Sequence, residues 1–176
     1  MTAKNFDVLV IGATGFVGKR FSRQLSIYCE QKNLSYCLSA RSKEKLDELK
    51  TKLADLEFAH FELLDISDKK AVADLVKKAK IVTNFAGPFD YYGDHVVEAC
   101  ANFGVHYLDI TGEIQFARRI IKKYHNIAKD NGALIVPFAG FDSVPSDLGT
   151  YMAAKKLVET YQTPCNSVDL IYSSSG

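Results

Sequence analysis

The first residues whose spacing indicates chemistry are three glycines, Gly12, Gly15 and Gly18, in the stretch VIGATGFVGKR. They follow an apolar run and precede a segment of helical period, the context in which a glycine-rich turn binds phosphate groups. Gly12 allows a sharp turn, Gly15 lets the backbone and its amide approach a diphosphate at the positive end of the helix, and Gly18 lets the helix pack on the strand. The turn predicts a dinucleotide site, and close packing alone is the alternative interpretation. The residues expected to contact the dinucleotide here are Gly12, Ala13, Thr14, Gly15, Phe16 and Val17.

The end of the second predicted strand indicates which dinucleotide is bound. An acidic residue at this position accepts hydrogen bonds from a ribose 2′-hydroxyl and repels a 2′-phosphate. The stretch CLSARSKEK has no acidic residue before Glu44 and offers hydroxyls and cations instead, from Ser39, Arg41, Ser42 and the following lysines. These groups suit a phosphate dianion, so NADP(H) is the predicted cofactor. The alternative is that Arg41 and the lysines are the solvated start of a helix.

The ends of the third and fourth predicted strands complete the expected cofactor site. Asp65 is predicted to accept the adenine amino group while Ile66 packs on the ring, although Asp65 could equally cap the next helix. The stretch NFAGPF ends the fourth strand, where the strand order of a doubly wound sheet reverses and ligands bind. Here Ala86, Gly87 and Pro88 are expected beside the nicotinamide ribose.

Candidates for catalysis follow the ends of later strands. Hydride transfer needs a polar group that holds or protonates the substrate, and Tyr92, Glu113 and Asp142 are the candidates for it. Structural roles are the alternatives. Glu113 could cap the long helix that follows it, Asp142 could hydrogen-bond to the loop at residues 143–146, and the tyrosine could simply pack.

Tyr151 and Lys155 match the Tyr-x-x-x-Lys pair of short-chain dehydrogenases. In those enzymes the pair lies on the helix after the fifth strand, whereas here it follows the sixth. The helix after the fifth predicted strand has Tyr124, with Ala128 in the lysine position. We interpret the match as a coincidence, because a short pattern outside its structural context is weak support.

Short β-rich runs alternate with longer amphipathic segments, and this alternation must position the residues above. Strands are predicted at residues 6–11, 34–40, 57–65, 80–87, 105–112 and 133–139. Helices are predicted at residues 15–30, 42–53, 67–79, 93–104, 113–132 and 145–161. The first helix is expected to pack through the stripe Phe16, Val17, Phe21, Leu25 and Tyr28, and Ser42 and Ser67 are expected to cap the second and third. The predicted class is α/β, a doubly wound parallel sheet of the Rossmann type with six parallel strands and a terminal seventh extended segment at residues 167–176.

The composition excludes several classes of protein. The 176 residues include 22 Lys and Arg and 21 Asp and Glu, a net charge of +1, so no nucleic-acid partner is expected. The four cysteines and four histidines do not cluster, and no metal site is predicted. No export signal and no membrane span are recognised, which favours a protein of the reducing cytoplasm.

Three stretches also resemble a known family: GATGFVGKR, AGPFDYYGDHVVEACANFGVHYLDITGE and GFDSVPSDLG. In this order they are similar to the saccharopine dehydrogenase-like oxidoreductases, a family that includes trans-acting enoyl reductases of bacterial lipid synthesis. The resemblance extends from about Phe6 to Tyr172.

The resemblance implies an NADP-binding Rossmann domain, expected at residues 1–162, and residues 163–176 as the start of a C-terminal substrate domain. It also implies a small or lipid-like substrate for hydride transfer and a homodimer as the expected oligomer. Two alternatives stay open, a non-enzymatic nucleotide-binding or assembly module and a single-domain atypical short-chain reductase.

Overall fold

The computed structural model describes residues 4–53 and 57–173. The strands are β1 (Phe6–Ile11), β2 (Tyr36–Ala40), β3 (Ala59–Leu63), β4 (Ala79–Asn84), β5 (His106–Asp109) and β6 (Ile135–Val136). The helices are α1 (Phe16–Lys32), α2 (Lys43–Lys52), α3 (Lys69–Val76), α4 (Phe89–Phe103), α5 (Ile114–Asp130) and α6 (Val144–Tyr161). In this part of the chain the strands form one parallel sheet in the order β3-β2-β1-β4-β5-β6, which confirms the predicted doubly wound α/β fold.

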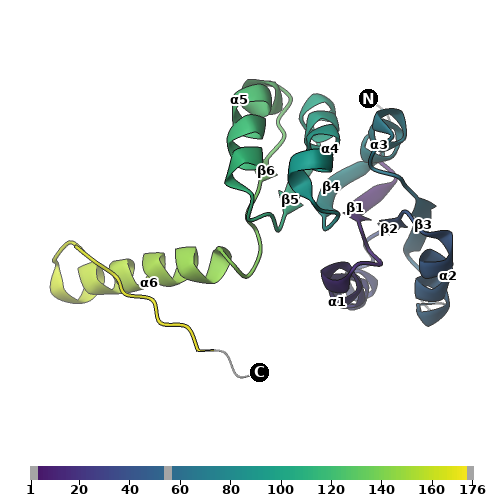
Figure 1. The fold of residues 1–176 in the computed structure, drawn as a ribbon. Helices are drawn as coiled ribbons and strands as arrows, with labels where there is room; N and C mark the ends of the chain where they lie inside the picture. The colour runs from purple at the N-terminus through teal and green to yellow at the C-terminus, as the bar shows by residue number, and fades with distance from the viewer. Residues whose placement is uncertain (1–3, 54–56, 174–176) are drawn as a thin grey trace.

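Helices cover the sheet on both faces (Figure 1), with α3, α4 and α5 on one side and α1 and α2 on the other. The central strand β1 contributes to both cores, because successive side chains of a strand point to opposite faces. Leu9 packs in the cluster that contains Val82 and Tyr107, whereas Val10 packs with Tyr36. A strand covered on both faces is nearly all apolar, as β1 is from Val8 to Ile11, which explains why β1 was recognisable from the sequence.

The predicted apolar stripe of α1 is only partly confirmed, because Phe21 and Leu25 pack against the cluster that contains Val10 and Tyr36 but the other members do not. Phe16, Val17 and Tyr28 are exposed, and Phe21 and Leu25 are only partly buried. The residues that α1 buries are Gly18, Ser22, Ser26 and Cys29. Small side chains let this helix approach the sheet closely, and the Ser26 hydroxyl is satisfied within the helix by donating to the Ser22 carbonyl at 2.7 Å.

The predicted helix caps are partly confirmed. Ser42 caps α2 by accepting a hydrogen bond from the Lys45 amide. Ser67 does not cap α3, because the carboxylate of the next residue, Asp68, accepts from two first-turn amides of that helix. Helix α4 begins at Phe89, earlier than its predicted start at residue 93.

Helix α6 projects from the sheet (Figure 1), and none of its residues is buried. Pro145 lies in its first turn, as predicted. Residues 163–173 form no strand, so the predicted seventh extended segment does not extend the sheet, and its last three residues lie outside the described part. Among the described helices, none is both long enough and apolar enough to cross a membrane.

Candidate functional site

A cleft lies at the carboxyl ends of β1 and β4, where the strand order reverses. Ligands of open α/β sheets bind at this switch point. The turn from β1 into α1 forms one wall, and Gly12 adopts a φ of +81° there, in the left-handed region that favours glycine. A Cβ on Gly12 would lie 2.9 Å from the Ala86 nitrogen, and a Cβ on Gly18 would overlap the Gly12 carbonyl oxygen. Both glycines are therefore required by close packing, whether or not a ligand binds.

The backbone amides of this turn separate into two groups. The amides of Gly12 and Ala13 donate to the Ser39 carbonyl, and the amide of Gly15 donates to the Gly12 carbonyl. The Gly15 amide is thus used within the turn, contrary to the expectation that it points at a diphosphate. Among the described residues, no protein group accepts from the amides of Phe16 and Val17, and Gly15 provides no side-chain cap. These first-turn amides keep the capacity to bind an anion.

The cleft has a volume of about 340 Å³, within the range of small-molecule sites. The predicted cofactor residues that line it are Gly12, Thr14, Gly15, Arg41, Asp65, Ile66, Ala86 and Gly87. The catalytic candidate Tyr92 also lines it, and further lining residues that the sequence did not single out are Ile11, Ala40, Leu64, Ser67 and Phe85. Ala13, Phe16, Val17, Ser39, Ser42 and Pro88 are not among the lining residues.

Two of the predicted 2′-phosphate contacts have other partners. Ser39 is fully buried, and its hydroxyl donates to the Val10 carbonyl at 2.9 Å, so it points into the sheet and away from the cleft. The Ser42 hydroxyl donates to Glu44 at 2.8 Å and caps α2. Arg41 is exposed and lines the cleft, and its guanidinium is the predicted group that remains available to a phosphate.

Asp65 lies in the cleft and also forms a local turn. Its carboxylate accepts from the amide of Ser67 at 2.9 Å and from its hydroxyl at 2.8 Å. These two hydrogen bonds, with a smaller contribution from Arg41, hold the pKa of Asp65 below its usual value. The alternative that Asp65 caps α3 is wrong, since Asp68 does so.

A buried polar network lies behind the β4–α4 side of the cleft, and the sequence interpretation missed it. The Asn84 side chain accepts from the Ala86 amide at 3.0 Å and donates to the Tyr107 hydroxyl at 3.4 Å. That hydroxyl donates to Asp109 at 2.8 Å, and Asp109 also accepts from the Phe138 amide at 3.2 Å. Burial raises the pKa of Asp109 above its usual value, and it raises the pKa of Tyr107 well above its usual value. Polar residues at the ends of otherwise apolar strands were the signal that could have indicated this network.

The three catalytic candidates lie in different environments. Tyr92 is in the first turn of α4 and lines the cleft. Glu113 does not line it. Its carboxylate accepts from the backbone amides of Phe89 and Asp90, so it caps α4 and not its own helix α5. Asp142 is exposed and does not line the cleft, and in the described part of the chain its carboxylate has no hydrogen-bond partner.

The Tyr151 and Lys155 pair lies on the projecting helix α6, and Tyr151 is 61% exposed. The Lys155 ammonium is 6.0 Å from the Tyr151 ring centroid, and neither residue lines the cleft. The geometry agrees with the interpretation of this match as a coincidence.

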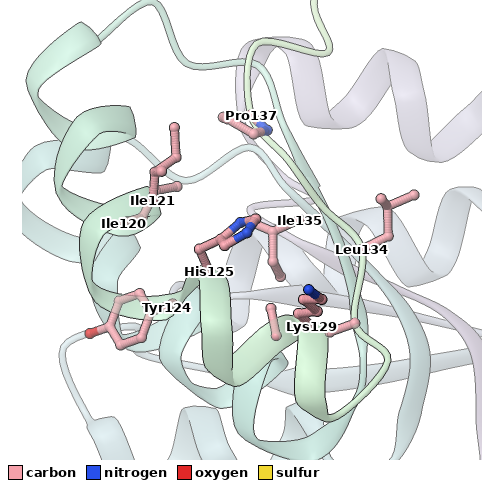
Figure 2. A pocket seen from close by; sticks show the side chains of 10 residues that line it. Ile120, Ile121, Tyr124, His125, Lys129, Leu134, Ile135 and Pro137 are labelled. Carbon is pink, nitrogen blue, oxygen red and sulfur yellow. The ribbon is translucent and has the colours of Figure 1, made fainter.

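A second cavity of about 350 Å³ lies between α5 and the segment that contains β6 (Figure 2). Its walls are mainly apolar, with Ile120, Ile135 and Pro137, and with His125 and Lys129 as basic groups. This cavity has no glycine-rich turn, so the switch-point cleft is the better candidate site.

Comparison with known proteins shows clear similarities. A family model described as "Saccharopine dehydrogenase NADP binding domain" matches residues 8–136. A trans-acting enoyl reductase of Mycobacterium tuberculosis (strain ATCC 25618 / H37Rv) is 35% identical over 173 residues, which are 97% of this chain and 41% of that protein. A saccharopine dehydrogenase-like oxidoreductase of Mus musculus is 36% identical over 155 residues, 82% of this chain and 36% of the relative. The chain therefore spans about two fifths of the length of these relatives.

Solved structures share the fold. Saccharopine dehydrogenase (L-Glu forming) from Saccharomyces cerevisiae matches with a TM-score of 0.71 at 14% identity, over 88% of this chain and 32% of that one. Yeast methylglyoxal/isovaleraldehyde reductase Gre2, solved with NADPH, matches with a TM-score of 0.57 at 17% identity, over 74% of this chain and 52% of that one.

Proposed function

Because the chain belongs to the family of saccharopine dehydrogenase NADP binding domains, we propose that it is the NADP(H)-binding part of an oxidoreductase that transfers hydride to or from a small or lipid-like substrate. The observation that carries this proposal is the switch-point cleft with the uncapped amides of α1 beside it. A helix terminus of this kind stabilises the negative charge of a diphosphate.

The cleft and the start of α1 beside it fit the parts of NADP(H). The amides of Phe16 and Val17, residues that lie beside the cleft, would hold the diphosphate, and Arg41 in the lining would pair with the 2′-phosphate. Ile66 would pack against the adenine, with Asp65 at its edge. Ala86 and Gly87 would lie beside the nicotinamide ribose. When bound, the nicotinamide supplies or accepts the hydride, and the protein binds and orients it.

The substrate side of the reaction is proposed from two observations. Tyr92 is the cleft-lining side chain of the β4–α4 wall that can donate a proton, and it would hold or protonate the substrate. Relatives named trans-acting enoyl reductases favour a lipid-like enoyl substrate. We also propose that residues 1–162 are the cofactor domain and that residues 163–176 are the start of a substrate domain. A cytoplasmic homodimer is the expected oligomeric form of the protein.

Titration of the purified chain with NADPH and with NADH tests the cofactor part. We expect NADPH to bind at least about tenfold more tightly, since the 2′-phosphate adds a charge-assisted contact. Absence of NADPH binding would refute the proposal. Oxidation of NADPH, followed at 340 nm with a trans-2-enoyl thioester present, tests hydride transfer. Tight binding without oxidation would favour a nucleotide-binding module over an enzyme.

A further inference from the structure

The region where α4 begins points to a second role for Glu113, and we infer that it is a positioning residue for the cofactor cleft. Its carboxylate, at the end of the β5–α5 connection, caps α4 at Phe89 and Asp90 and thereby fixes the segment that carries the lining residues Phe85, Ala86, Gly87 and Tyr92. This inference rests on the proposed function and adds a residue that does not itself line the site.

Helix α4 needs a cap from elsewhere in the chain. Its N-cap residue is Pro88, which has no side-chain acceptor for the first-turn amides. The two oxygens of Glu113 accept from the Phe89 amide at 3.0 Å and from the Asp90 amide at 2.6 Å. Charged acceptors on backbone amides form strong hydrogen bonds, and the negative charge lies at the positive end of the helix. One side chain therefore satisfies two donors that would otherwise lack partners.

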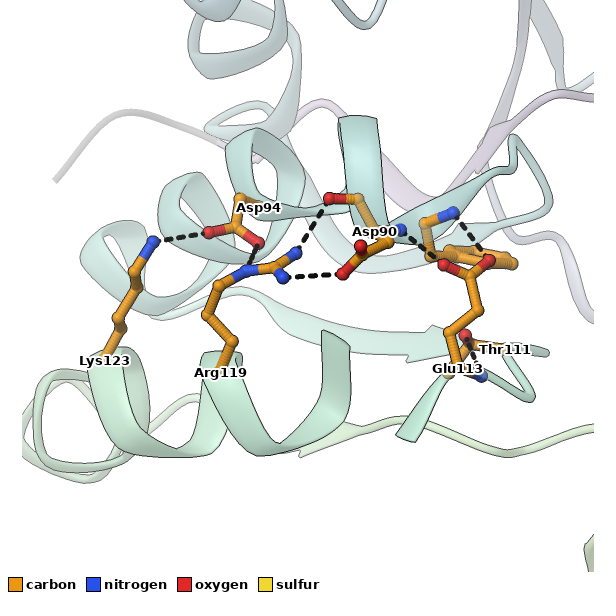
Figure 3. A network of polar contacts seen from close by, with 7 residues as sticks. Asp90, Asp94, Thr111, Glu113, Arg119 and Lys123 are labelled. Carbon is orange, nitrogen blue, oxygen red and sulfur yellow. Dashed lines mark hydrogen bonds and ion pairs between the residues drawn. The ribbon is translucent and has the colours of Figure 1, made fainter. Parts of the chain in front are cut away.

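The end of β5 holds Glu113 in place (Figure 3). The Glu113 amide donates to the Thr111 hydroxyl oxygen at 3.0 Å. The Thr111 amide in turn donates to the Asp109 carboxylate at 3.0 Å. Thr111 and Asp109 are each only 2% exposed. The capping carboxylate thus extends from a buried network and is fixed in position relative to the sheet.

The cleft wall is anchored at both of its ends. At the start, the Asn84 side chain accepts from the Ala86 amide, and at the other end Glu113 accepts from the first turn of α4. Between these anchors, Phe85, Ala86 and Gly87 face the cleft, followed by Tyr92. Loss of the second anchor would free the wall while leaving every lining residue unchanged.

Arg119 offers a matched control, because it also joins α4 to α5 (Figure 3). Its guanidinium donates to the Asp90 carboxylate at 2.6 Å and to the Asp94 carboxylate at 2.9 Å. A third bond goes to the Asp90 carbonyl at 2.8 Å. None of these three residues lines the cleft. Arg119→Gln should therefore loosen the packing of the two helices while both hydrogen bonds from the α4 amides to Glu113 remain in place.

The experiment measures NADPH affinity by fluorescence titration for wild type, Glu113→Ala, Glu113→Gln and Arg119→Gln. We expect Glu113→Ala to weaken binding about tenfold, the size expected for the loss of a charged cap. Glu113→Gln keeps one acceptor oxygen and should rescue most of that loss, to about threefold. The NADPH affinity of Arg119→Gln should stay within about twofold of that of wild type, although the thermal midpoint of this variant falls. If Glu113→Ala does not fold, Glu113→Gln against Arg119→Gln decides the question.

Affinity of Glu113→Ala equal to that of wild type would overturn the inference, and so would an equal loss in Arg119→Gln. Amide hydrogen exchange without nucleotide provides a separate readout. Faster exchange of Ala86 and Gly87 in Glu113→Ala supports the anchoring of the wall, and unchanged exchange overturns it. A wild-type chain that does not bind NADPH would refute the proposed function, and the exchange comparison would still decide the role of Glu113.

Discussion

Replacement of Arg41 by alanine tests how the cleft selects its dinucleotide. Arg41 is the predicted phosphate contact that lines the cleft and whose side chain has no hydrogen bond or salt bridge among the described residues, since Ser39 and Ser42 are engaged elsewhere. Charge-assisted hydrogen bonds contribute about 1.5–3 kcal/mol, and solvent screening of the exposed Arg41 reduces this to about 1–2 kcal/mol. We therefore expect NADPH affinity to fall about 5- to 30-fold, whereas NADH affinity should not change.

The assay is calorimetric titration of both dinucleotides at two salt concentrations, with Lys50→Ala as the matched control. Lys50 carries the same charge, lies over the Phe61 ring at 5.9 Å and does not line the cleft. The preference of wild type for NADPH should shrink as salt increases, because ions screen the phosphate contact. An equal loss of NADH and NADPH affinity in Arg41→Ala, or the same loss in Lys50→Ala, would refute the reasoning.

Three further predictions follow from the packing and the buried charges. Gly18→Ala places a Cβ against the Gly12 carbonyl, so we expect the free energy of unfolding to fall by about 3 kcal/mol or more in urea denaturation, and an unchanged midpoint would contradict the packing. Burial raises the folded pKa of Asp109 above its unfolded value, so its contribution to stability is present at low pH and is lost as pH rises through the folded pKa. Asp109→Asn should therefore gain stability relative to wild type as pH rises above the usual pKa of an aspartate, about 4, and parallel pH profiles in denaturation would argue against this assignment. Tyr151→Phe should leave NADPH affinity and any NADPH oxidation unchanged, because Tyr151 lies on α6 away from the cleft, and a loss of turnover would revive the short-chain reductase alternative.

The features that local patterns specify were predictable from the sequence. The Gly12 to Gly18 turn, the Ser42 cap and the alternation of strands with helices depend on residues close together in the chain. The α/β class follows from that alternation, because parallel strands need helical crossovers. The cleft residues at the ends of β1, β3 and β4 follow from the class itself, since parallel strands end at one edge of the sheet.

Other features depend on geometry that spacing does not show. The stripe expected on α1 was right only at Phe21 and Leu25, because the close approach of this helix to the sheet selects small residues, whereas hydrophobicity alone also favours Phe16 and Tyr28. The use of the Gly15 amide within its own turn is a detail of backbone direction. The capping of α4 by Glu113 joins residues 24 positions apart in the sequence. An acidic residue just before a helix is instead expected to cap that helix, which here is α5.

Helix α6 has no buried side chain, so its stability does not depend on the packing that holds the sheet together. A single helix of this length is only marginally stable in water without tertiary contacts, and Gly149 in its interior weakens it further. Its backbone hydrogen bonds can therefore open while the six strands stay intact. Proteases that need an unfolded substrate should therefore cleave α6 before they cleave the core. Helix α6 and the sheet should also not unfold in a single cooperative transition.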